Sequence, residues 1–165
     1  MTFSGNIKKE FIEEIPHKTC CRRAMAYGLL FDAFLDGDKI HIDLSDIEHA
    51  DFCRRVFERQ FSKEVTVTPV KKAGREHFRV SFEFASVAKK ISVLDKEGAQ
   101  IRDYLEFKCP YCRMNFLRCI FLSRGTLTSA PSNNHLEYRI QSPCSRAMCP
   151  RYRTLRHMFL VPDCI

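Results

Sequence analysis

The 165-residue chain carries 27 lysine and arginine residues against 20 acidic ones, a net charge of +7, and 45% of its residues are hydrophobic. This composition is typical of a folded domain with a hydrophobic core, and no apolar run approaches the roughly 20 residues of a membrane-spanning helix. The amphipathic N-terminus contains acids, which excludes a secretory signal, so we expect a cytoplasmic protein without membrane contact.

The N-terminal part of the chain predicts two helices and then a half-buried strand. The first helix starts at a Ser4 cap, continues to about Ile15 and is ended by Pro16. The second, at about 20–33, is nearly all apolar after its arginines, which indicates burial on several sides. An Asp-Gly turn then leads to 39–44, where apolar and polar side chains alternate as they do in a strand.

The middle of the chain predicts a third helix and a β-hairpin. The helix begins at a cap formed by Ser45 or Asp46 and ends near Phe61, with an inner stripe of Ile47, Phe52, Val56 and Phe57. Residues 64–70 and 76–84 form the two strands of the hairpin. One face of the second strand is apolar and carries Phe78, Val80, Phe82 and Phe84.

The C-terminal part predicts further helices and one more strand. Helical segments are expected at about 86–94 and 98–106, followed by a helix at about 110–123 that starts at a Cys-Pro-Tyr-Cys motif. A turn-rich stretch covers 129–134, and 135–140 alternates as a strand. No linker separates these elements into domains.

Two of the predicted helix–strand units repeat each other. When Cys21 is laid on Cys112, "CRRAMAYGLLFDAF" covers "CRMNFLRCIFLSRG", with arginine after cysteine and a bulky apolar trio in both. Gly28 and Leu29 then match Cys119 and Ile120, and "KIHIDL" matches "HLEYRI" after a short insertion. Such internal symmetry predicts two pseudo-symmetric halves around a central pair of helices, which small residues allow to pack closely.

This layout resembles the LAGLIDADG homing-endonuclease fold, and more closely the catalytically silent form of that fold in the WhiA family of sporulation regulators. "FSGNIKKEFIEEIP" and "KTCCRRAMAYGLL" are similar to the start and first repeat of that family, and "CRMNFLRCIFLSRGTLTSAPSNNHLEYRI" is similar to its second repeat. The resemblance implies an α+β, LAGLIDADG-like domain over residues 1–140, with repeats at about 17–84 and 108–140, that is incomplete at its C-terminus. It also implies non-catalytic, nucleoid-associated DNA binding in the transcriptional control of sporulation or cell division.

The resemblance also implies where a nuclease would carry its metal ligands. Homing endonucleases of this fold place an acid near the end of each central helix, because Mg²⁺ takes carboxylate oxygens. In the register of Gly28 and Cys119 these positions are Ala33 and Arg124, neither of which can bind a metal. A shift of one residue brings in Asp32, but its partner is then Ser123. We therefore expect no cleavage.

The Cys-Pro-Tyr-Cys motif at 109–112 leaves three interpretations open. A glutaredoxin-type site needs a thiolate at a helix N-terminus, which is present here, but such folds place the motif after their first strand, whereas most of this chain precedes it. A zinc site would pair Cys109 and Cys112 with Cys144 and Cys149, at a spacing that fits no common zinc motif, and the adjacent Cys20 and Cys21 suit chelation poorly. The third interpretation, buried apolar cysteines without metal or cofactor, is preferred.

Strand residues that face away from the helices are the candidates for contact with double-stranded DNA. They would supply salt-sensitive contacts to phosphates rather than base readout. The strand candidates are Lys39, His41, Thr66, Thr68, Arg79, Ser81 and Arg139, and the candidates at the hairpin tip are Lys71, Lys72 and Arg75. Asp43, Glu83 and Glu137 lie on the same face and would weaken binding.

The last residues, 141–165, depart from the family pattern. They contain four arginines against one acid and show no helical stripe, whereas WhiA-like proteins continue into a C-terminal helix-turn-helix. We expect a basic, divergent tail that results from a frameshift or truncation, or that belongs to a short natural relative. The alternative function is a module that docks on transcription machinery or on a full-length relative through an apolar patch at Phe78 or Phe82.

Overall fold

The computed structural model describes residues 3–31, 33–85, 107–129 and 134–138. The predicted helical segments at 86–94 and 98–106, Asp32, Arg139 and the tail at 141–165 lie outside these residues. The helices are α1 (Phe3–Ile12), α2 (Thr19–Leu30), α3 (Ile47–Phe61) and α5 (Pro110–Arg124). The strands are β1 (Phe34–Asp36), β2 (Lys39–Leu44), β3 (Thr66–Lys72), β4 (Arg75–Glu83), β5 (Gly125–Ser129) and β6 (Asn134–Tyr138).

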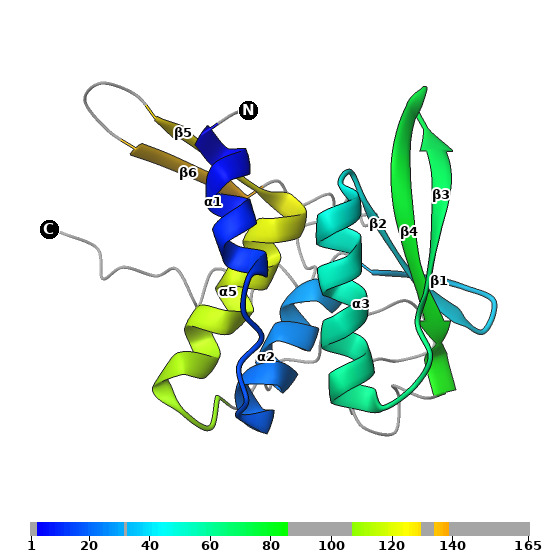
Figure 1. The fold of residues 1–165 in the computed structure, drawn as a ribbon, viewed down its shortest axis with the longest axis horizontal. Coiled ribbons are helices and arrows are strands. Elements are labelled where there is room, and N and C mark those ends of the chain that lie inside the picture. The colour runs from blue at the N-terminus through cyan, green and yellow to red at the C-terminus, as the bar shows by residue number, and fades with distance from the viewer. Residues whose placement is uncertain (1–2, 32, 86–106, 130–133, 139–165) are drawn as a thin grey trace, which may run out of the picture.

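The architecture is α+β, with helices packed against one side of an antiparallel sheet. Four strands form this sheet in the order β1-β2-β4-β3, and β5 pairs with β6 in a separate hairpin. Figure 1 shows α2, α3 and α5 side by side, with the sheet flanking α3 and the β5–β6 hairpin above α5. The α+β, LAGLIDADG-like fold class predicted above is confirmed in this arrangement and in the comparisons given below.

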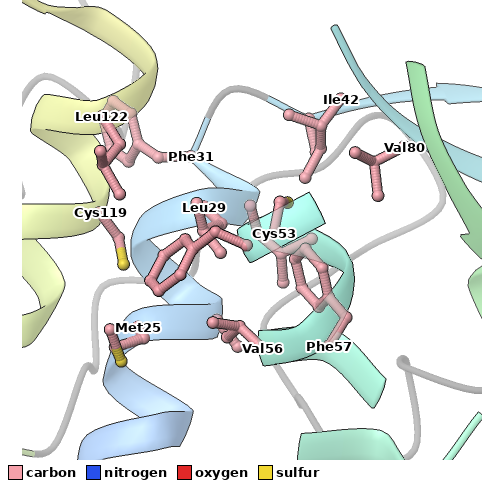
Figure 2. Packing of buried hydrophobic residues seen from close by; sticks show 14 of the residues in the cluster. Met25, Leu29, Phe31, Ile42, Cys53, Val56, Phe57, Val80, Cys119 and Leu122 are labelled. Atoms are coloured by element: carbon pink, nitrogen blue, oxygen red, sulfur yellow. The ribbon is translucent and has the colours of Figure 1, made fainter. Parts of the chain in front are cut away.

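The core forms where the apolar face of the sheet meets α2 and α3. Ile42 of β2 and Val80 of β4 are directly opposite in the register, and both are fully buried. They face Cys53 and Phe57 of α3 (Figure 2). The remaining large, fully buried side chains are Phe52, Phe116, Met25, Leu29, Leu30, Ile40, Ile120 and Val56. The apolar side chains that recur every two residues along the strands and every 3.6 residues along the helices pack together in this core.

Most elements fall where the sequence predicts them, and α3 has the cap expected for it. Asp46 has extended backbone, and its side chain accepts a hydrogen bond from Glu48 N–H at 2.8 Å. The inner stripe is wrong at Ile47, whose exposed fraction is 50%. At about 100° per residue, Ile47 lies outside the arc of α3 that faces the core.

Both ends predicted for α1 are wrong. Ser4 lies inside the helix, and its hydroxyl accepts a hydrogen bond from Leu127 N–H at 3.3 Å. The helix ends at Ile12 rather than Ile15, because the guanidinium of Arg118 on α5 donates to the carbonyls of Phe11 and Glu14. These contacts satisfy carbonyls at the end of α1 and join it to α5.

Strands β1 and β5 were not predicted. Each is short and directly follows a central helix, α2 or α5, so that in both halves the helix leads into a two-stranded hairpin. Of the two segments that align in the sequence repeat, β2 covers the first, and β6 covers the described part of the second, residues 135–138. The order of elements in the two halves therefore agrees with the repeat.

Candidate nucleic-acid interface

The central helices α2 and α5 pack with almost no side chain between them. A β-carbon added at Gly28 would lie 2.8 Å from the β-carbon of Cys119 and would also overlap the carbonyl of Phe116. Leu29 and Ile120, the next residues on each helix, are buried in the core. This close contact sets the positions of the two hairpins that follow the helices.

The outer face of the four-stranded sheet carries the predicted strand candidates. His41, Ser81 and Thr66 lie in one row across β2, β4 and β3, and Asp43, Arg79 and Thr68 lie in the next row. Since directly opposite residues share one face of a sheet, the six side chains form a continuous surface. We refer to these two rows as the outer face.

An ion pair between Asp43 and Arg79 lies at the centre of the outer face. Arg79 donates from Nε and a terminal nitrogen to the two carboxylate oxygens of Asp43, at 2.7 and 3.0 Å. Lys72 Nζ lies 3.7 Å from the same carboxylate. The hydrogen bonds from Arg79 hold the pKa of Asp43 below its usual value, against the effect of burial. The carboxylate is 6% exposed and balances the charge of Arg79.

Phe34 of β1 completes this surface and was missed in the sequence analysis. The guanidinium of Arg79 lies 5.2 Å from the centroid of its ring, and the ring of His41 lies 5.4 Å from it. The sequence contains the signal for this strand, because apolar residues flank the Asp-Gly turn on both sides, as they do in a hairpin. Phe34 is 37% exposed, so the outer face presents an aromatic ring beside its ion pair.

His41 contributes a polar group rather than a positive charge. Its Nδ1 lies 2.8 Å from the hydroxyl of Ser81. Burial lowers the pKa of His41 below its usual value, and the neighbouring Arg79 lowers it further. At neutral pH the imidazole is therefore uncharged.

The positive charges without a counter-ion lie around the outer face rather than within it. Lys71 and Arg75 at the tip of the β3–β4 hairpin, and Lys39 at the start of β2, form no ion pair within the described part of the chain and are exposed. The hairpin turns through Ala73 and Gly74, which both have positive φ, at 50° and 74°. This is the backbone of a tight two-residue turn, and it holds Lys72 and Arg75 opposite each other.

The two residues predicted from the resemblance to stand at the acid positions of a nuclease lie at the ends of the two central helices. Ala33 is buried just beyond α2, and Arg124 is the last residue of α5. Neither side chain can supply a carboxylate ligand.

The two residues expected to form an exposed apolar patch for a docking module are not uncovered in the structure. Phe82 is 4% exposed and belongs to the core, where its ring lies 4.5 Å from that of Phe57. Phe78 is partly buried and packs against the same core. The prediction of an uncovered patch at these two residues is therefore wrong, because α3 covers the inner face of the sheet.

A second constellation lies at the other end of the central helices. Four thiols come together there, with every pair of Sγ atoms within 4.8 Å. We call this group the cysteine cluster; it consists of Cys20, Cys21, Cys109 and Cys112. The zinc site considered from the sequence instead paired Cys109 and Cys112 with Cys144 and Cys149, which lie outside the described residues.

The thiols of the cysteine cluster differ in their surroundings. Burial raises the pKa of Cys21 to about 12. Cys109 is partly exposed at the N-cap of α5, and a hydrogen bond from the Cys112 thiol lowers its pKa to about 7. The cluster therefore has one side open to solvent and one side in the core.

Comparison with known proteins identifies relatives of this fold. The chain is 25% identical over 154 residues to the "Probable cell division protein WhiA" of Carboxydothermus hydrogenoformans, a match that covers 85% of the chain and 49% of that protein. It thus spans about half the length of this curated relative. No family model matches the sequence. Within the ranges described above, no helix is both long and apolar enough to cross a membrane.

Two solved structures share the arrangement of elements. The N-terminal LAGLIDADG domain of DUF199/WhiA superposes with a TM-score of 0.64 at 18% identity, over 96% of this chain and 75% of that domain. Full-length DUF199/WhiA from Thermatoga maritima gives a TM-score of 0.58 at 20% identity, over 78% of this chain and 41% of that protein. The chain is therefore similar to WhiA and has the LAGLIDADG fold of the WhiA N-terminal domain.

Proposed function

We propose that this chain is a non-catalytic DNA-binding domain of a WhiA-type regulator, acting in the transcriptional control of cell division or sporulation at the nucleoid. One observation supports the proposal: the β3–β4 hairpin extends past the helices (Figure 1) and carries at its tip Lys71 and Arg75, which form no ion pair with the residues that the structure describes. Figure 1 shows the β5–β6 hairpin extending in the same direction on the other side of the helices. Two such hairpins can straddle a duplex.

The charges at the tip suit contact with phosphates rather than with base edges. Lys71 and Arg75 have long, exposed side chains, and the rigid two-residue turn limits the freedom that binding must remove. Lys72 Nζ lies 3.7 Å from the carboxylate of Asp43. At this distance the lysine can leave the carboxylate and bind a phosphate instead. Contacts of this kind give affinity that does not depend on base sequence.

The outer face has a different role in this proposal. Its ion pair leaves Arg79 balanced and its histidine uncharged, so it adds little net attraction. The outer face can contact a duplex through its shape and through the partly exposed ring of Phe34. We infer that the hairpin tip supplies affinity, while the outer face limits how closely the duplex approaches.

The absence of cleavage is part of the proposal. Metal-dependent cleavage requires carboxylates where the fold places its divalent ions. The corresponding positions in this chain, Ala33 and Arg124, offer a methyl group and a positive charge. Arginine there would repel a metal ion, and would instead favour a phosphate.

The test is a fluorescence-anisotropy titration of labelled duplex DNA with variants at two sites. Removing the tip charges through Lys71→Gln, Lys72→Gln and Arg75→Gln in one protein is expected to weaken binding by roughly ten- to a hundredfold. The matched control changes three exposed cations at the opposite end of the molecule, Lys18→Gln, Arg59→Gln and Lys63→Gln, and loses the same formal charge.

The control separates a local contact from a general effect of charge. Equal weakening in the two triple variants would mean that net charge alone attracts DNA and would refute the hairpin tip as a binding surface. Unchanged binding in the tip variant would refute it as well.

A further inference from the structure

We propose that the cysteine cluster is a structural zinc site that joins the start of α2 to the start of α5. Nothing in the comparisons assigns a metal to either helix, and this inference does not depend on the proposed binding of DNA. It depends on the positions of four thiols and on the packing that brings them together.

The packing of the two central helices makes the cluster a consequence of the fold. Gly28 and Cys119 lie at a point where α2 and α5 approach closely. Cys21 and Cys112 each lie about two helical turns earlier in the same helix, and both are buried. Because the helices run side by side from the same end, their first turns meet, as Figure 1 shows.

The distances in the cluster are those of a tetrathiolate zinc site. Cys109 Sγ lies 3.7 Å from that of Cys20, 3.5 Å from that of Cys21 and 3.4 Å from that of Cys112. Four sulfurs at about 2.3 Å from a central zinc ion, in a tetrahedron, are about 3.8 Å apart. Small movements of the thiols therefore suffice to admit the ion.

The composition of the site points to zinc among the divalent metals. Thiolates are soft ligands, which excludes Mg²⁺ and Ca²⁺, and a closed set of four cysteines is one of the common forms of a structural zinc site. Binding is not a redox step: Zn²⁺ replaces the protons of the thiols, which are released to solvent as four Zn–S bonds form.

The surroundings also suit a tetrathiolate centre, whose formal charge is negative. Lys18, Arg22 and Arg23 flank the first cysteine pair in sequence, and Lys108 precedes the second. The positive ends of two helix dipoles point toward the thiols. Cys20 and Cys109 are only partly buried, so an ion can enter from solvent.

Cys53 shows what a cysteine used only for packing looks like in this protein. It is fully buried beneath the sheet, and its thiol belongs to the apolar core. The clustered thiols differ from it in lying against one another, with Cys20 and Cys109 partly exposed. This contrast provides a control variant.

The test measures metal in the full chain, purified without an affinity tag under reducing conditions. We expect about one zinc per chain by mass spectrometry of the metal content. After removal of zinc, Co²⁺ should restore the sulfur-to-cobalt charge-transfer band and the intense visible bands of tetrahedral thiolate ligation. Iron in place of zinc, or no metal and no such spectrum, would overturn the assignment.

Three variants identify the ligands. Cys20→Ser with Cys21→Ser should reduce the metal content to background and abolish the cobalt spectrum. Cys53→Ala, and Cys144→Ser with Cys149→Ser, should leave both unchanged. Retention of the full spectrum in the Cys20/Cys21 variant, or its loss in the Cys144/Cys149 variant, would show that other residues bind the metal. Far-ultraviolet circular dichroism of each variant establishes that it is folded.

A chelator provides an independent readout on the unaltered chain. Removing zinc should lower the thermal midpoint of unfolding, and returning zinc should restore it, because metal that binds only the folded chain stabilises it. The Cys20/Cys21 variant should not respond to either treatment. An equal response in that variant would contradict the proposed site.

Discussion

Gly28 and Cys119 lie face to face where α2 crosses α5, and a β-carbon at Gly28 would come within 2.8 Å of the β-carbon of Cys119. This contact fixes how closely the two central helices pack against each other. On one side of it the first turns of the two helices bring the clustered cysteines together, and on the other side the helices lead into the β1–β2 and β5–β6 hairpins.

Replacing Gly28 by alanine should destabilise the protein. Alanine ordinarily stabilises a helix by about 1 kcal/mol relative to glycine, but here its methyl group would overlap the backbone of α5. Overpacking of this kind costs about 1–3 kcal/mol, so we expect a net loss in the free energy of unfolding, measured with urea. Arg23→Ala, at an exposed position of the same helix, should change it by no more than about 0.5 kcal/mol. A more stable Gly28→Ala protein would show that the helices are not in contact at this residue.

The ion pair between Asp43 and Arg79 should make stability depend on pH in the acid range. The pKa of Asp43 is lower in the folded chain than in the unfolded chain, because Arg79 donates hydrogen bonds to the carboxylate. Its stabilising contribution is therefore complete above the unfolded pKa, about 3.9, and is lost as the pH falls through the lower, folded value.

The variant Asp43→Asn removes this contribution. At neutral pH we expect it to cost about 1–3 kcal/mol, because Arg79 loses a charged partner. As the pH falls below the unfolded pKa and through the lower, folded pKa of Asp43, the difference from the unaltered chain should shrink, since Asp43 itself then becomes protonated. Asp38→Asn, at an exposed turn position, is the control. A difference that stays constant with pH would show that the pair does not titrate as argued.

The cap of α3 provides a test with adjacent residues. Asp46→Ala removes the oxygen that accepts from Glu48 N–H and should destabilise the protein by about 1 kcal/mol. Ser45→Ala, one residue earlier, should have almost no effect, because Ser45 lies outside the helix and makes no such bond. The two single variants are compared by urea unfolding. A reversed order would move the start of the helix by one residue.

The sequence predicts those parts of the fold that rest on local pattern. Alternation identifies β2 and β4, and the apolar spacing of α3 identifies its buried face, because each pattern reflects one packing surface. The missed strands β1 and β5 are too short to show alternation. The end of α1 could not be predicted either, because Arg118, more than one hundred residues away in sequence, determines it.

In the candidate site, too, features set by local pattern could be predicted, and features set by residues distant in sequence could not. The faces of the outer strands could be predicted from alternation, whereas the pairing of Arg79 with Asp43 depends on the register between β2 and β4. The cysteine cluster was missed because spacing along the chain was the only guide. Adjacent cysteines are a poor zinc motif in sequence, yet the packing of α2 against α5 places both thiols beside Cys109.

The most direct test of the proposed function is the salt dependence of duplex affinity for the unaltered chain. Three cations at the hairpin tip should give a slope of about −2 to −3 in a plot of the logarithm of the association constant against that of the salt concentration, because each phosphate contact contributes about −0.9. A slope in this range would support binding through the hairpin tip. Affinity independent of salt, or no binding at the lowest salt concentration, would contradict it.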